Sequence, residues 1–275
     1  DRIQELVTGG HYTALPLTAE RVAKIDFGDA MEIYSERFAD ADDFTFVFVG
    51  NMTPKALEPF LEGYIASLPS ADEKETWGDV GIERPVGVVE DEVLAGIEPQ
   101  SQAIIIYHGD YEWSRVSNHK LLSLADALRI RLREVLREDE SGTYGVGVRA
   151  GFERYPRERY TMQIYFGASP DRVEALADLA METIDEFRDN PPAQEYLTKV
   201  KATQRESFEL DIRENSYWVN GIKNALVHGR ELSSVLAYPE LIDALDAEDI
   251  AETARGYLDE ERYLRVILYP ASTVE

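Results

Sequence analysis

The chain has 275 residues, 44% of them hydrophobic and 10% aromatic, so it can bury a substantial core. Its 53 acidic residues outnumber its 28 basic residues, and the resulting formal charge of −25 repels nucleic-acid phosphates and anionic lipid. We therefore expect no nucleic-acid partner, and we expect no membrane insertion because no apolar run approaches the roughly 20 residues of a membrane-spanning helix.

Two further features of the composition leave alternatives open. The absence of cysteine excludes disulfides and thiolate metal sites but does not identify the redox compartment. The acidic surface is consistent with adaptation to high salt and equally with an unexceptional source. The chain begins at Asp1 without a signal segment, which is typical of a mature product or a fragment.

The N-terminal quarter predicts a helix, a buried strand and a second helix. Thr18 can cap the first helix. The run FTFVFVGN, residues 44–51, is continuously apolar or β-branched, as in a strand buried on both faces. Thr53 and Pro54 then supply an N-cap and a first-turn proline for the second helix. This order indicates an α/β layout.

The rest of the chain predicts a sheet with several helices. Residues 69–100 are rich in proline, glycine and acidic residues and indicate a linker or crossover with a short strand at 87–93. Further strands are expected at 101–109, 143–153, 159–168 and 262–270, and helices at 115–137, 169–187, 193–213, 215–228 and 247–258. The predicted fold class is a layered α+β domain: a mixed, largely antiparallel sheet with helices packed on one side.

Two parts of the chain echo each other. LTAERV leads through a helix to DFTFVFVGN, and LDAEDI leads through a helix to RYLRVILYP. The echo is either chance, because a capped helix before a buried strand is common, or the closing elements of two copies of one fold.

The usual catalytic and cofactor motifs are missing from the sequence. The four histidines, His11, His108, His119 and His228, have none of the spacings of a zinc site, so we expect no metal or cofactor in this chain. No phosphate-binding glycine loop and no GxSxG motif occurs. His108 lies at the end of a predicted buried strand, which leaves open a stand-alone hydrolase that uses it as a base.

Arg137 and Tyr144 flank the predicted junction between the long helix and the next strand. A guanidinium group and a phenol hydroxyl can both bind a peptide carbonyl or stabilise an oxyanion. From the residues alone, a simpler interpretation is favoured: an arginine that the dipole stabilises at a helix C-terminus and a tyrosine packed in the sheet.

The segment LREDESGTYGV, which contains both residues, resembles the LREExGxxYxV signature in the second half of the pitrilysin and insulinase family of zinc metallopeptidases. DFTFVFVGNMTPKALEPFLEGYIASLP is similar to that family's strand and helix ending in YxxSLP, and LTAERV is similar to its helix opener. FGASPDRVEAL and YLRVILYPAS resemble the long, two-halved bacterial members, so the resemblance extends over nearly the whole chain.

The resemblance implies a metallohydrolase-like fold in which two halves, each a pair of α/β domains, close around a peptide substrate. The N-terminal half of such enzymes holds the zinc ion, and the C-terminal half has lost the zinc ligands. This chain matches the C-terminal half, so its implied partner is a zinc-binding N-terminal half, in the same protein or in a partner subunit. Carried over to this sequence, Arg137 would bind substrate near the scissile bond, and Tyr144 would donate its hydroxyl to the developing oxyanion.

The same resemblance implies a domain division and a location. Residues 1–75 would be the C-terminal part of a preceding α/β domain, 76–98 a linker, and 99–275 a complete inactive domain of the peptidase type. Alone, the chain would be catalytically inactive. Since the long bacterial relatives are typically exported, the periplasm or cell envelope is the expected compartment. A non-catalytic scaffold or peptide-binding module, like the core subunits of respiratory complexes, is the alternative function.

Overall fold

The structure, a computed structural model, describes residues 1–71, 75–138 and 145–271, and for residues 137 and 138 it describes the backbone only. The chain divides into two compact units. Unit 1 comprises Asp1–Leu15, Asp79–Arg205 and Glu240–Glu275, and unit 2 comprises Pro16–Gly78 and Glu206–Pro239.

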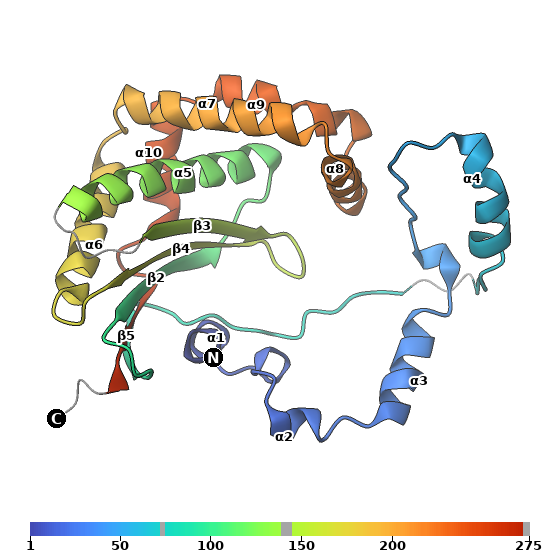
Figure 1. Ribbon diagram of the computed structural model, residues 1–275, viewed down its shortest axis with the longest axis horizontal. Helices are drawn as coiled ribbons and strands as arrows, with labels where there is room; N and C mark the ends of the chain where they lie inside the picture. The colour runs from blue at the N-terminus through green and yellow to red at the C-terminus, as the bar shows by residue number, and fades with distance from the viewer. Residues whose placement is uncertain (72–74, 139–144, 272–275) are drawn as a thin grey trace. The chain divides into compact units, whose positions relative to one another are not determined.

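Unit 1 contains a five-stranded sheet in the order β1-β5-β2-β4-β3 (Figure 1). β1 pairs with β5 in parallel, and the other three pairings are antiparallel. The strands are β1 Val89–Leu94, β2 Ser101–Asp110, β3 Val146–Glu153, β4 Arg159–Ala168 and β5 Tyr263–Tyr269. This mixed, largely antiparallel sheet confirms the predicted fold class.

Helices cover one face of this sheet, here called the first face. In Figure 1 α5, α6 and α10 lie on that side, whereas α1 lies on the other side, so not every helix of unit 1 packs on one face. The helices that lie in unit 1, wholly or in part, are α1 Arg2–Thr8, α5 Arg115–Glu138, α6 Val173–Asp189, α7 Gln194–Asp211, α9 Tyr238–Ala244 and α10 Ala247–Tyr257.

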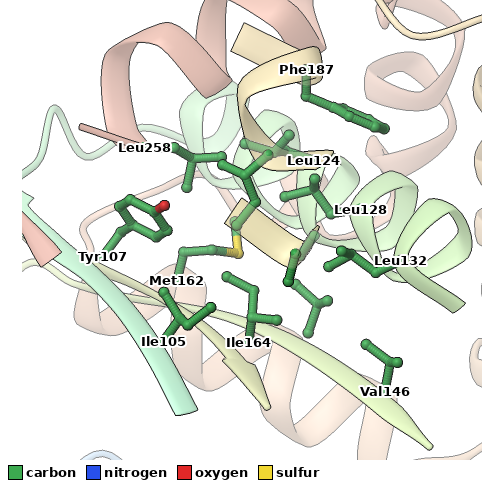
Figure 2. Packing of buried hydrophobic residues seen from close by; sticks show 14 of the residues in the cluster. Ile105, Tyr107, Leu124, Leu128, Leu132, Val146, Met162, Ile164, Phe187 and Leu258 are labelled. Atoms are coloured by element: carbon green, nitrogen blue, oxygen red, sulfur yellow. The ribbon is translucent and has the colours of Figure 1, made fainter. Parts of the chain in front are cut away.

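The hydrophobic core lies between the first face and helices α5, α6, α7 and α10 (Figure 2). β4 alternates strictly, with Met162 and Ile164 fully buried in the core and their sequence neighbours on the other face. Ile105 of β2 is the cross-strand partner of Ile164, and its side chain points into the same core. From α5 come five fully buried leucines at helical spacing: Leu121, Leu124, Leu128, Leu132 and Leu136. Each such side chain contributes roughly 1.5–3 kcal/mol by its burial.

Unit 2 is helical and has a small cluster of partly buried aromatic side chains. Phe208 packs edge to face on Tyr217 and also contacts the ring of Tyr238. The Tyr217 hydroxyl donates to the Val235 carbonyl over 2.6 Å, and the Trp218 indole donates to the Ile212 carbonyl over 2.9 Å. The regular elements of unit 2 are α2 Ala19–Val22, α3 Phe27–Arg37, a 3₁₀ turn Ala41–Asp43, α4 Pro54–Phe60, a π-helical turn Leu61–Ile65, α8 Asn215–Val227 and a 3₁₀ segment Leu232–Leu236. Unit 1 contains a further 3₁₀ turn at Tyr12–Ala14.

The capping predictions for unit 2 are confirmed, but the predicted helix after Thr18 is two helices. The Thr18 hydroxyl accepts from the Arg21 amide over 3.3 Å, and the Thr53 hydroxyl accepts from the Ala56 amide over 3.2 Å. A second cap, Asp26, accepts from the Asp29 amide over 3.0 Å and starts α3 after a break. The helix is interrupted before Phe27 because the Asp26 carboxylate, and not a backbone carbonyl, accepts the hydrogen bond of the Asp29 amide.

The prediction of a buried strand at 44–51 is wrong for this structure. These residues form no strand, and the rings of Phe44, Phe46 and Phe48 are 39%, 42% and 48% exposed. A strand buried on both faces needs neighbouring strands and covering helices, and no described strand of this chain pairs with 44–51. The helix predicted at 169–187 starts later than expected, because α6 begins at Val173.

Candidate functional site

The frame of the predicted Arg137 and Tyr144 site is the end of α5 and the start of β3. α5 begins after Ser114, whose hydroxyl accepts from the Ser117 amide over 2.9 Å. Near its other end, Leu136 is fully buried in the core. β3 starts at Val146, which is also buried in the core. Both ends of the junction are therefore anchored in the same hydrophobic cluster.

The structure places Arg137 in the last turn of α5, next to Leu136. Its side chain and all of Tyr144 lie outside the described residues, so the distance between the two groups stays a prediction. Gly145 precedes β3 with a φ of 148°, a backbone conformation that favours glycine. The end of α5 and the start of β3 thus lie where the helix-to-strand junction was predicted. Gly145 directly precedes β3 in a conformation that would strain a residue with a side chain.

The described residues do not fit a zinc ion. Among them no group of three or more histidine, aspartate or glutamate side chains could hold a metal. The histidines lie on separate elements, with His108 in β2 and His119 in α5. Burial is the main cause that lowers the pKa of each of these two imidazoles to about 4, so both are neutral at pH 7.

His108 does not have the setting of a hydrolytic base. Its side chain points to the face of the sheet away from the core, here called the second face, yet the residue is only 1% exposed. No described residue forms a hydrogen bond with its Nε2. A general base needs a substrate or nucleophile within hydrogen-bond reach, and burial denies it both.

The second face carries a cavity of about 230 Å³ beside the edge strand β3. Register explains its floor: Arg149 of β3 lies opposite Gln163 of β4, which lies opposite Ile106 of β2. Val7 of α1, which is far from these strands in the sequence, also lines the cavity. The full lining is Val7, Ile106, Arg149, Ala150, Gly151, Thr161 and Gln163. This second-face cavity lies entirely within unit 1.

The polar side chains of the second-face cavity have no hydrogen-bond or ion-pair partner among the described residues. Within the described part of the chain, Arg149, Thr161 and Gln163 make no side-chain hydrogen bond or ion pair. The Arg149 guanidinium lies over the Tyr165 ring, 5.2 Å from its centroid. Tyr165 can occupy that place because its cross-strand partner is Gly147, where a Cβ atom would come within 2.1 Å of the ring.

Sequence reasoning did not single out these residues. The alternation in VGVRAGFE and RYTMQIYFGA does place Arg149, Thr161 and Gln163 on the polar face of their strands, so a signal existed. It was incomplete, because the pairing register brings the three side chains together and α1 adds Val7 to the lining.

Three comparisons with known proteins bear on this arrangement. The sequence model of the family described as "Peptidase M16 inactive domain" matches residues 25–204. The probable zinc protease PqqL of Haemophilus influenzae is 27% identical over 236 residues, which cover 81% of this chain and 24% of that protein. This chain spans about a quarter of the length of the curated relatives that it matches.

Solved structures show the same fold. The periplasmic protease PqqL from Escherichia coli superposes with a TM-score of 0.78 at 21% identity, over 94% of this chain and 28% of that one. The peptidase M16 inactive domain from Pseudomonas fluorescens gives 0.78 at 17% identity, over 98% of this chain and 64% of that one. No described helix has the length and apolar character needed to cross a membrane.

Proposed function

Because the chain belongs to the peptidase M16 inactive domain family, we propose that it is the zinc-free, C-terminal part of a pitrilysin/insulinase-type metallopeptidase. In this role it helps to form the chamber that encloses a peptide substrate. The zinc ion is held by an N-terminal half of the same protein or by a partner subunit. The observation that carries the proposal is the family match over 180 residues together with relatives named as zinc proteases.

Arg137 and Tyr144 are the proposed contribution of this chain to catalysis. The Arg137 guanidinium binds substrate near the scissile bond, and the Tyr144 hydroxyl donates to the oxyanion that develops on the peptide carbonyl. The anchoring of Leu136 and Val146 in one core supports this role, because catalytic groups need rigid elements behind them.

The proposed domain division is a C-terminal part of a preceding α/β domain at 1–75, a linker at 76–98 and a complete domain at 99–275. Exposed apolar side chains in the first segment support it, since Ile25 is 62% exposed and Phe27 78% exposed. Such exposure is expected of elements whose covering sheet belongs to another part of the protein. The linker range contributes β1, which pairs with β5.

The proposed compartment is the periplasm or cell envelope. One structural relative is described as a periplasmic protease, and this supports the assignment by analogy.

The direct test is substitution of each donor in the enzyme reconstituted with its zinc-binding half. We expect Arg137→Gln and Tyr144→Phe each to lower kcat/KM by more than about tenfold, which is 1.4 kcal/mol of transition-state stabilisation. The matched control is Arg133→Gln, an exposed arginine one helical turn earlier in α5. Losses well under tenfold, or equal losses in the control, would remove the assigned roles and favour the scaffold alternative.

A further inference from the structure

The second-face cavity has the charge of an anion site within a strongly acidic protein. The chain carries 53 acidic residues against 28 basic ones, so an arginine in this protein has many possible partners. Yet the cavity lining contains Arg149 and no acidic side chain, and Arg149 makes no ion pair with any described residue. A guanidinium that lines a cavity and has no carboxylate partner within the described protein can bind the carboxylate of a ligand.

The neighbouring side chains add hydrogen-bond donors to this charge. The Thr161 hydroxyl and the Gln163 amide both line the cavity and are unpaired among the described residues. Stacking on Tyr165 restrains the Arg149 guanidinium and leaves its N–H groups free at the rim. A carboxylate accepts up to about four hydrogen bonds, so these three groups match its needs.

We propose that the second-face cavity binds the carboxylate of an extended peptide, either its C-terminal α-carboxylate or an Asp or Glu side chain. This inference rests on the proposed function, because it identifies a subsite for the peptide that the chamber encloses. It concerns residues on β3 and β4, away from the Arg137 and Tyr144 junction.

The shape of the site favours a peptide over a larger ligand. Its volume of about 230 Å³ is below the roughly 300–1,000 Å³ of pockets for drug-sized ligands and cofactors. β3 is the edge strand of the sheet, so one side of its backbone is unpaired in the described structure.

The apolar part of the cavity fits the same ligand. Val7 and Ile106 also line the cavity. They can cover the methylene groups of a glutamate side chain or the last side chain before a free C-terminus. α1, which carries Val7, is held to the sheet by an ion pair of 2.5 Å between Arg2 and Asp91.

The test measures binding of fluorescent nine-residue peptides to the intact 275-residue chain by polarisation in 0.15 M salt. Three peptides of serine, threonine and alanine are compared: one with a free C-terminus, one amidated, and one amidated with a central glutamate. We expect at least one carboxylate-bearing peptide to bind at least about tenfold more tightly than the neutral amidated peptide. The peptide that shows the difference identifies which carboxylate the cavity accepts.

Two variants locate the effect. Arg149→Gln should abolish the preference for the carboxylate, and Gln163→Leu should reduce it without removing a charge. Arg133→Gln removes the same charge from an exposed face of α5 and should leave the preference unchanged. Far-UV circular dichroism checks that each variant is folded.

Equal binding of all three peptides up to millimolar concentration would overturn the proposal. Equal losses in Arg149→Gln and Arg133→Gln would also overturn it, because they would indicate general electrostatic attraction. The assay needs neither zinc nor turnover, so its failure is distinct from a failure of the roles of Arg137 and Tyr144.

Discussion

Replacement of His108 by glutamine should reduce the loss in the free energy of unfolding of unit 1 as the pH falls below neutrality. His108 is 1% exposed, and burial together with neighbouring arginine guanidinium groups lowers its pKa from an ordinary value of about 6.5 to about 4. The unfolded chain therefore binds a proton at His108 in a pH range where the folded chain does not. Stability from the neutral imidazole is fully present above pH 6.5 and is lost as the pH falls toward 4.

The size of the effect follows from the two pKa values. Between pH 7.5 and pH 5.0, linkage gives a loss of about 2 kcal/mol in the free energy of unfolding from His108 alone. His119, whose pKa is also lowered to about 4, contributes a separate loss in the same direction.

The assay is urea unfolding at pH 7.5 and pH 5.0, followed by the fluorescence of Trp113, which lies in unit 1. Trp77→Phe and Trp218→Phe remove the signal of unit 2 in every protein compared. Between the two pH values the parent should lose about 2 kcal/mol more than His108→Gln. Ile106→Val, a destabilising but non-titrating change on the same strand face, should keep the full pH dependence. Equal pH dependence in the parent and His108→Gln would refute the reasoning.

Three further outcomes are expected. Leu128→Ala leaves a cavity at a fully buried position and should lower the free energy of unfolding by about 2–5 kcal/mol, measured in urea; a loss under 1 kcal/mol would contradict the described core. Tyr160→Phe removes a 2.6 Å hydrogen bond to the Tyr257 carbonyl and should cost about 1–3 kcal/mol by the same measurement; unchanged stability would mean that the carbonyl finds another donor. Removal of divalent metal with EDTA should change the Tm of this chain by less than about 1 °C in calorimetry, and a larger drop would reveal a structural metal.

Local pattern was sufficient to predict most of unit 1. The leucines of α5 recur at helical spacing, and the alternation of β4 separates Met162 and Ile164 from Thr161 and Gln163. Because these patterns agree with the tertiary burial, strands, helices and fold class could be predicted without long-range information.

Local pattern was insufficient where a partner element decides the outcome. The apolar run 44–51 carries the composition of a buried strand, but a strand forms only where another strand completes its hydrogen bonds. The second-face cavity could not be predicted for a related reason. Val7 and Arg149 are far apart in sequence, and the lining forms only through the register of β3, β4 and β2 together with the position of α1. Arg137 and Tyr144 were found through family resemblance, because chemistry alone favoured an ordinary helix end.

The central claim is that this chain completes a zinc peptidase whose metal belongs to another segment. The most direct measurement compares kcat/KM for a fluorogenic peptide with the zinc-binding half alone, with this chain alone and with both mixed. The account predicts no turnover by this chain alone and at least a tenfold gain in kcat/KM when it is added to the zinc-binding half. Turnover by this chain alone, or a zinc-binding half whose activity is unchanged by the addition, would contradict it.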